Sequence, residues 1–281
     1  MTERSRLPIV VGGCHRSGTS LVRRILNAHP GIHCGPELTF LRDFHGDFHG
    51  DPFARLRFAR TARDYLSEDD ALRALGRAFL EVHELAARRA GKARWADKAP
   101  ENVIHLDTWE DLLDGGFLFV HVVRGPLDNV ASMQGRFPLT LPEELDARVD
   151  LYRAYTEAGL TFGDECPERY HRVVYEELCL DPAASVDELM TWLGEEPDDA
   201  QLAFNTNLHQ EGLEDPKVAE TSQVHRESVG RWRSVLTDGE AEHVWARTSD
   251  LWAQVDPAGR HWPALGRGSS PPHRGTTMTG S

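Results

Sequence analysis

Cysteines, excess basic charge and long apolar runs are all scarce or missing in this chain of 281 residues. The cysteines are too few for a disulfide scaffold and lack the spacing of a metal site, being only Cys14, Cys34, Cys166 and Cys179. No apolar run approaches the roughly 18 residues that a membrane-spanning helix needs, and residues 1–8 show no signal-peptide core. We therefore expect a cytoplasmic protein with reduced thiols and no membrane segment.

The charge balance excludes one class of partner. The formal net charge is −14, whereas binding to nucleic acid usually needs a basic surface, so we expect no nucleic-acid partner. Hydrophobic residues make up 40% of the chain and charged residues 27%, as in soluble globular proteins. The length predicts one α/β domain over residues 1–265, followed by a disordered Gly-, Ser-, Pro- and Thr-rich tail over residues 266–281.

What the chain does contain is a characteristic stretch at residues 8–30. The β-branched run Ile9–Val11 predicts a buried parallel strand, which Gly12 and Gly13 end. Helical spacing then extends over residues 19–30, up to a proline. A strand, a glycine-bearing loop and a helix start together bind anions, because backbone N–H groups and the helix dipole converge there.

The details of this loop argue against a magnesium–triphosphate ligand. Residues Gly13 to Ser20 have the frame G-x-x-x-x-G-T-S, with Thr19 where the Walker lysine normally stands. That lysine reaches the β- and γ-phosphates of a nucleotide, and here the positive charge is instead at Arg16. A P-loop small-molecule kinase or other phosphotransferase is therefore kept as an alternative, as is a non-catalytic nucleotide-binding module.

A carboxylate follows closely. Glu37 comes just after a short connector or edge strand predicted at residues 31–35, where it is placed to act as a general base. The alternative is a carboxylate that faces the dipole of the next helix. Residues 42–92 follow as a helical insertion that we expect near the acceptor site. The His45 to Asp51 stretch, with its repeated glycines, favours a loop over a metal site.

Two further strands are predicted to end in a basic residue. Lys98 follows a strand predicted at residues 94–96, so it points toward the crevice where parallel sheets bind ligands. The alternative is an exposed lysine paired with Asp97 or Glu101. The apolar run at residues 117–123 predicts a second buried strand that ends at an arginine.

That arginine, Arg124, precedes a helix predicted from about residue 127. Ser132 lies two turns into this helix, so a guanidinium and a hydroxyl can meet on one phosphate. The alternative is an arginine that satisfies the backbone groups at a strand or helix end.

The second half of the chain continues the alternation of strands and helices. Residues 142–166 predict a long amphipathic helix, residues 170–178 a strand, and residues 181–194 another helix. A further helical pattern begins after Asp238. Tyr175 is predicted to lie either near a nucleotide or in the core at a strand end.

Four of these segments resemble the motifs of sulfotransferases. They are Gly13-Cys-His-Arg-Ser-Gly-Thr-Ser-Leu21, Ala28-His-Pro30, Cys34-Gly-Pro-Glu37 and Arg124-Gly-Pro-Leu-Asp-Asn-Val-Ala-Ser132. The likeness is strongest to the tyrosylprotein sulfotransferase branch and its bacterial relatives. It implies a fold like that of P-loop-containing nucleoside triphosphate hydrolases, with a mostly parallel central sheet flanked by helices.

The resemblance also implies an activity and its donor. Sulfotransferases move a sulfuryl group from 3′-phosphoadenosine 5′-phosphosulfate (PAPS) to an acceptor hydroxyl by in-line displacement, and a metal is not required. In the family the loop binds the 5′-phosphosulfate, and the second motif binds the 3′-phosphate. The donor-binding positions of the family correspond here to His15, Arg16, Ser17, Gly18, Thr19, Ser20, Arg124, Ser132, Tyr175, Ser222, Arg226 and Arg231.

Three residues are implied to take part in the reaction. Glu37 corresponds to the proton acceptor of the family, and Lys98 and Arg16 would neutralise the bridging and equatorial oxygens. The longer Arg-Lys-Gly signature of other branches is absent, which leaves Arg226 and Arg231 as alternatives for the C-terminal phosphate contact. We expect a small-molecule acceptor rather than a protein tyrosine. The identity of this acceptor and the oligomeric state stay open.

Overall fold

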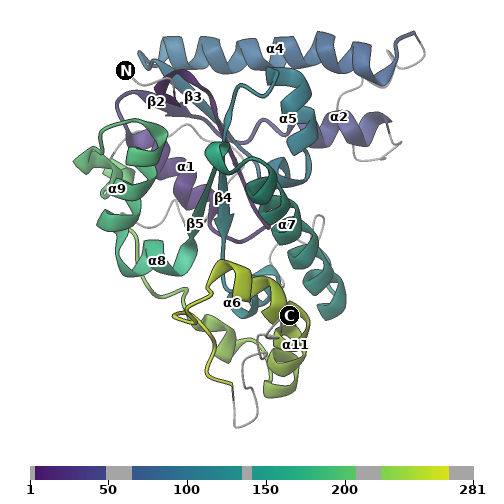
Figure 1. Ribbon diagram of the computed structural model, residues 1–281, viewed down its shortest axis with the longest axis vertical. Coiled ribbons are helices and arrows are strands. Elements are labelled where there is room, and N and C mark those ends of the chain that lie inside the picture. The colour runs from purple at the N-terminus through teal and green to yellow at the C-terminus, as the bar shows by residue number, and fades with distance from the viewer. Residues whose placement is uncertain (1–3, 49–64, 135–140, 207–222, 266–281) are drawn as a thin grey trace, which may run out of the picture.

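A sheet of parallel strands forms the centre of the protein in the computed structural model (Figure 1). The structure describes residues 4–48, 65–134, 141–206 and 223–265. The strands lie in the order β2-β3-β1-β4-β5 and are β1 (Ile9–Gly12), β2 (Ile32–Cys34), β3 (Arg94–Lys98), β4 (Leu118–Val123) and β5 (Tyr170–Val174). This arrangement confirms the predicted α/β fold with a parallel sheet.

Strand β1 lies in the middle of the sheet, which explains its apolar sequence. Val10 is in register with Asp97 of β3 on one side and with Phe119 of β4 on the other. Both faces of β1 and β4 are covered, so every residue of the two strands is buried. Chain connections leave the sheet toward opposite edges from β1 and β4, and open parallel sheets bind ligands at such a switch point.

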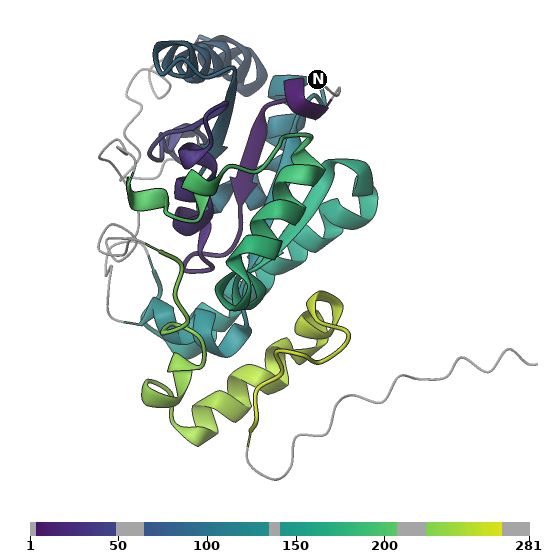
Figure 2. The same ribbon diagram turned by 90° about the vertical axis from the view of Figure 1, so that its left-hand side faces the viewer.

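Helices cover both faces of the sheet, as Figures 1 and 2 show. Ile9 and Val11 pack into a core formed with α1 (Thr19–Ala28), α8 (Tyr175–Leu180) and α9 (Pro182–Leu193). Val10 faces the opposite core. The helices of that side are α4 (Glu68–Arg89), α5 (Leu106–Leu113), α6 (Pro126–Met133), α7 (Leu145–Glu165) and α11 (Asp238–Val255). Period-2 alternation along the strands therefore feeds two separate cores.

One strand boundary was predicted wrongly. The strand expected over residues 170–178 ends at Val174, and helix α8 begins at Tyr175. The register pairs Val174 with Val123, the last residue of β4, so the chain has no ladder partner beyond that point. Glu176 and Glu177 then lie in the first turn of α8, where acidic side chains interact favourably with the helix dipole.

The predicted helical insertion contains two described helices, α2 (Phe40–Phe48) and α4, which packs against β3 and α5. Short 3-10 helices complete the described elements: η1 (Arg4–Arg6), η2 (Pro100–Ile104), η3 (Pro167–Arg169), η4 (Asp199–Gln201), η5 (Phe204–Thr206) and η6 (Arg231–Ser234). The tail at residues 266–281 lies outside the described residues.

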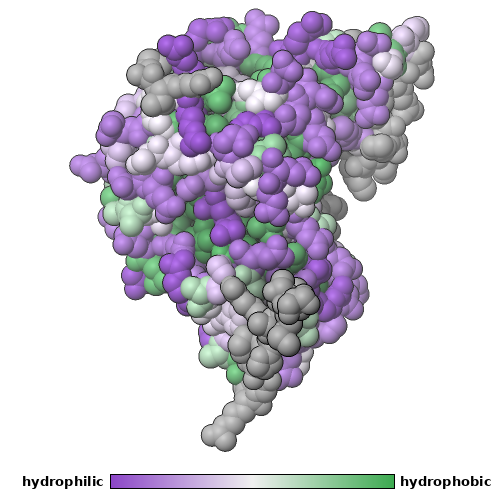
Figure 3. Space-filling model, viewed as in Figure 1, coloured by the Kyte–Doolittle hydropathy of each residue, from purple (hydrophilic) through white to green (hydrophobic). Residues whose placement is uncertain are grey.

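The surface is mainly polar. Hydrophilic side chains cover most of the face shown in Figure 3. Within the described ranges, no helix combines the length and apolar character that crossing a membrane requires.

Candidate functional site

The loop between β1 and α1 has the backbone conformation that its glycines permit. Gly13 has φ +152°, and a Cβ there would lie 2.2 Å from the Val122 carbonyl oxygen. Gly18 has φ +107°, and a Cβ there would lie 2.5 Å from the Tyr175 ring. Arg16 also adopts a left-handed conformation, with φ +69°. Close packing on both sides therefore fixes the loop against β4 and α8.

The loop delivers a helix start to the carboxyl edge of the sheet. Helix α1 begins at Thr19, so its first N–H groups have no intrahelical acceptor and can bind an anion. The Ser17 N–H does not belong to this set, because it donates to the Cys14 carbonyl at 3.0 Å. This amide therefore closes the loop itself.

Lys98 and Glu37 meet beside this helix start. Lys98, the last residue of β3, is only 1% exposed. Its ammonium donates to the Ser20 hydroxyl at 3.2 Å and forms an ion pair with the Glu37 carboxylate. The alternatives of an exposed lysine and of a carboxylate that only faces a helix dipole are therefore not what the structure shows. A buried cation, a carboxylate and the anion-binding loop share one place.

His15 of the same loop belongs to a second group of side chains. Its Nε2 lies 3.5 Å from a Glu101 carboxylate oxygen and 3.5 Å from the Tyr155 hydroxyl. Arg42 of α2 approaches the same Glu101 oxygen at 3.4 Å. Burial lowers the pKa of His15, which keeps its ring neutral near pH 7. We call His15, Arg42, Glu101 and Tyr155 the His15 cluster.

The two anion-binding motifs contact each other directly. The Arg16 Nε donates to the Ser132 hydroxyl of α6 at 3.4 Å. Arg124, the residue after β4, donates to the Arg16 carbonyl at 3.2 Å and lies 4.6 Å above the Tyr175 ring. These four predicted site residues therefore form one group, although the chain separates Arg16 from Ser132 by 116 positions.

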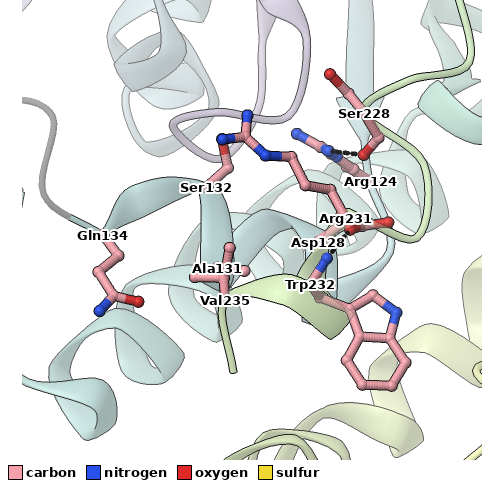
Figure 4. A pocket seen from close by; sticks show the side chains of 9 residues that line it. All are labelled: Arg124, Asp128, Ala131, Ser132, Gln134, Ser228, Arg231, Trp232 and Val235. Carbon is pink, nitrogen blue, oxygen red and sulfur yellow. Dashed lines mark hydrogen bonds between the residues drawn. The ribbon is translucent and has the colours of Figure 1, made fainter. Parts of the chain in front are cut away.

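A cavity of about 240 Å³ opens next to this group (Figure 4). Arg124, Ser132 and Arg231 all line it, and Arg231 points across it toward Ser132. Arg226 does not line it, because its guanidinium donates to the Leu180 carbonyl at 2.6 Å. Two guanidinium groups and a hydroxyl are the donors that bind a phosphate well.

Sequence reasoning missed two carboxylates near the cavity. Asp128 lines it and is almost fully buried. Glu176 is also buried, and its carboxylate accepts the Gly125 N–H at 2.9 Å. Burial raises the pKa of the Glu176 carboxyl to about 7. The position of Asp128 between Arg124 and Ser132 was a usable signal, whereas Glu176 fell within the misplaced strand.

Two predictions concern residues that the structure describes only in part or not at all. Ser222 and the segment from His49 to Asp51 lie outside the described residues. The loop expected from His45 onward is wrong for residues 45–48, which belong to helix α2. His45 stacks on the His105 ring with 4.6 Å between ring centroids and lies 3.1 Å from the Thr108 hydroxyl. Over the described ranges, no three His, Cys, Asp or Glu side chains gather as metal ligands would.

The protein has a P-loop-like fold: a parallel sheet, a glycine-bearing loop after its central strand β1, and an arginine directly after β4. The loop and the arginine lie at the switch point, where open parallel sheets bind ligands. Residues 8–199 match the sulfotransferase family. The match covers more than half of the chain, so the protein belongs to that family. This confirms the resemblance seen in the sequence.

Several known proteins are similar to this chain. The protein-tyrosine sulfotransferase 2 of Gallus gallus is 26% identical over 228 residues, which are 78% of this chain and 58% of that protein. The chain therefore spans little more than half the length of that relative. The sulfotransferase domain of the Synechococcus PCC 7002 olefin synthase has a TM-score of 0.66 and 22% identity, covering 89% of this chain and 94% of that one.

A third similar structure was solved with a nucleotide. It is the mouse sulfotransferase SULT7A1 complexed with adenosine 3′,5′-bisphosphate (PAP), which has a TM-score of 0.51 and 14% identity to this chain. The match covers 91% of this chain and 86% of that one. These structures share the fold of this protein.

Proposed function

We propose that the protein transfers a sulfuryl group from PAPS to the hydroxyl of a small molecule. The observation that carries the proposal is the contact of the Lys98 ammonium with both Ser20 at the anion-binding helix start and the Glu37 carboxylate. A group held at the helix start would lie beside a buried cation and the carboxylate that is paired with it. That is the arrangement needed to transfer an anionic group to a hydroxyl.

The residues around the cavity fit a donor that is phosphorylated at two ends. The helix start of α1 would hold the 5′-phosphosulfate. Arg124, Ser132 and Arg231 line one cavity, which suits the 3′-phosphate of adenosine 3′,5′-bisphosphate (PAP) and of PAPS. The mouse relative that carries PAP supports this choice of nucleotide. Between the two C-terminal candidates we therefore propose Arg231 rather than Arg226 as the phosphate contact.

The chain's own groups would manage the charge and the proton. The donor, when bound, supplies a sulfuryl group on a good leaving group. Lys98 and Arg16 would place positive charge beside the bridging and equatorial oxygens. Glu37, whose Oε1 pairs with Lys98, would accept the proton of the acceptor hydroxyl. The scheme uses no metal ion, because Lys98 and Arg16 supply the positive charge.

The acceptor is proposed from charge. The net charge of −14 opposes acidic acceptors, and in the His15 cluster the one guanidinium, that of Arg42, is paired with Glu101. The hydroxyl of a neutral small molecule suits this environment better than a hydroxyl flanked by acidic groups, because an acidic acceptor would need an excess of basic side chains. The Gallus gallus relative is named for protein tyrosine, so a tyrosine peptide is the competing acceptor.

The donor is tested by thermal unfolding with PAP and with ATP, each with and without magnesium. We expect PAP to raise the melting temperature without magnesium and to exceed ATP at equal concentration, because ligand bound only to the folded state stabilises it. Stabilisation by magnesium–ATP alone would instead establish the phosphotransferase alternative. Turnover of PAPS is then measured with phenols, aliphatic alcohols and a tyrosine peptide, and preference for the peptide would overturn the small-molecule acceptor.

A further inference from the structure

Asp128 makes contacts that its place in the phosphate-binding motif does not explain. It lies on α6 between Arg124 and Ser132, and it is only 7% exposed. One carboxylate oxygen accepts the Gly230 N–H at 2.6 Å, and the other accepts the Trp232 N–H at 2.8 Å. Both oxygens therefore accept hydrogen bonds from a segment that lies 102 to 104 positions further along the chain.

The residue between these two anchored amides is Arg231. Gly230 has φ +76°, a left-handed conformation that turns the chain into the 3-10 helix η6 at Arg231. With the amides on both sides held by one carboxylate, the direction in which the Arg231 side chain leaves the backbone is fixed. That side chain points across the cavity toward Ser132 (Figure 4).

A second contact holds the same segment. The Arg124 guanidinium donates to the Ser228 carbonyl, as the dashed line in Figure 4 shows. Arg124, which precedes α6, and Asp128, in its first turn, belong to one motif and hold residues 228–232 at separate points. Hydrogen bonds that involve a charged partner are the stronger kind, so this segment is set firmly against α6.

We propose that Asp128 is a positioning residue that aims Arg231 at the 3′-phosphate of the donor nucleotide. The inference rests on the proposed function, because the cavity must hold that phosphate. Both Asp128 oxygens accept backbone N–H groups, so the carboxylate is not itself a phosphate ligand. Its effect on binding is exerted through the guanidinium of Arg231, and it therefore appears only with ligands that carry a 3′-phosphate.

The test compares two nucleotides that differ in that phosphate alone. Dissociation constants for PAP and for adenosine 5′-monophosphate (AMP) are measured by calorimetry on the whole protein, for wild type, Asp128→Asn, Arg231→Gln and the double variant. Asn keeps the size of Asp but presents an NH₂ group to one of the two amides, so one anchor is lost. We expect roughly tenfold weaker PAP binding in each single variant, and less than about a twofold change for AMP.

The double variant decides whether the two residues act as a unit. If Asp128 acts through Arg231, the double variant binds PAP no more weakly than Arg231→Gln, since coupled residues are not additive. Independent, multiplied losses would overturn the proposal. Equal weakening of PAP and AMP by Asp128→Asn would do so too, because it would mean a merely structural role.

Asp256 supplies a matched control. It is also almost fully buried, and its two carboxylate oxygens accept the N–H groups of Arg260 and His261. It does not line the cavity, so Asp256→Asn should leave the ratio of the PAP and AMP constants unchanged. Should Asp128→Asn fail to fold, Gly230→Ala displaces the same turn and is expected to raise the ratio of the PAP dissociation constant to the AMP dissociation constant. A wild type that does not prefer PAP to AMP would instead refute the proposed function.

Discussion

The two halves of the candidate site are built in different ways. On the donor side, the loop after β1 and the residues 228–232 are fixed through backbone groups, which Arg124, Asp128 and close glycine packing hold. The His15 cluster, which we propose to lie on the acceptor side, consists of contacts between side chains at 3.4 to 3.5 Å. Backbone contacts leave few acceptable substitutions, whereas contacts between side chains can be exchanged. We therefore expect substitutions in the donor half to weaken donor binding strongly, and substitutions in the acceptor half to change acceptor binding only modestly.

The largest effect is expected at the boundary between the halves. Glu37→Gln should lower kcat on the order of a hundredfold or more, because amide replaces the only proposed base, while the Kd for PAP stays close to that of wild type. Steady-state kinetics and calorimetry measure the two quantities. Glu81→Gln, on an exposed position of α4, is the control. Unchanged turnover in Glu37→Gln would remove Glu37 as the base.

A pH effect is expected from the donor half. The pKa of Glu176 is about 7 in the folded protein because of burial, compared with about 4.5 for an ordinary glutamate. Between these values the folded state holds a proton that the unfolded state lacks, so this contribution to stability is complete below about pH 4.5 and is lost as the pH rises through about 7.

Glu176→Gln removes this dependence and keeps an acceptor for the Gly125 N–H. From about pH 5 to about pH 8, the unfolding free energy of the variant should gain up to about 3 kcal/mol relative to wild type. Denaturant unfolding at a series of pH values measures the difference. Glu177→Gln, at the neighbouring and partly exposed position, is the control. Parallel curves for wild type and Glu176→Gln would show that Glu176 titrates normally.

A smaller loss, of folding stability and of PAP affinity, is expected when a side chain is added in the loop after β1. Gly18→Ala combines an unfavourable φ with a Cβ only 2.5 Å from the Tyr175 ring, so we expect a cost of about 2 kcal/mol and weaker PAP binding. Gly91→Ala is matched to it, because Gly91 also has positive φ but nothing within 4 Å of its Cβ. Equal PAP affinities in the two variants would contradict close packing as the basis of the donor half.

The smallest effect is expected on the acceptor side. Arg42 is half-exposed and pairs with Glu101 of the His15 cluster. Arg42→Gln should raise the KM for the acceptor severalfold and leave the KM for the donor unchanged, since exposed ion pairs contribute little individually. Arg73→Gln on the exposed side of α4 controls for lost surface charge. A larger change in the donor KM would mean that the two halves are not separable.

Local patterns were sufficient for the framework of the fold. The apolar run before Gly12 and the run before Arg124 predicted β1 and β4, because a strand buried on both faces needs such a sequence. The end of β5 was missed, since the short stretch after Val174 suits a strand or a helix equally and only the end of its partner β4 decides between them.

Long-range contacts could not be predicted in the same way. The choice between Arg226 and Arg231 depends on the turn at Gly230 and on Asp128, which lies more than a hundred positions earlier. No periodicity relates residues so far apart. The pairing of Lys98 with Glu37 likewise depends on strands β2 and β3 being neighbours in the sheet, although their residues are not adjacent in the chain.

The central position of β1 has a consequence for the order in which the protein is made. Both neighbours of β1 come later in the chain, as β3 and β4, and the partner amides of Asp128 come later still. A ribosome therefore releases the anion-binding loop long before the strands that hold it in shape. Shortened translation products that end before Gly230 contain every residue of the loop but lack the segment that carries Arg231. Such products are expected to bind a 3′-phosphate less tightly than the finished protein, because they lack Arg231.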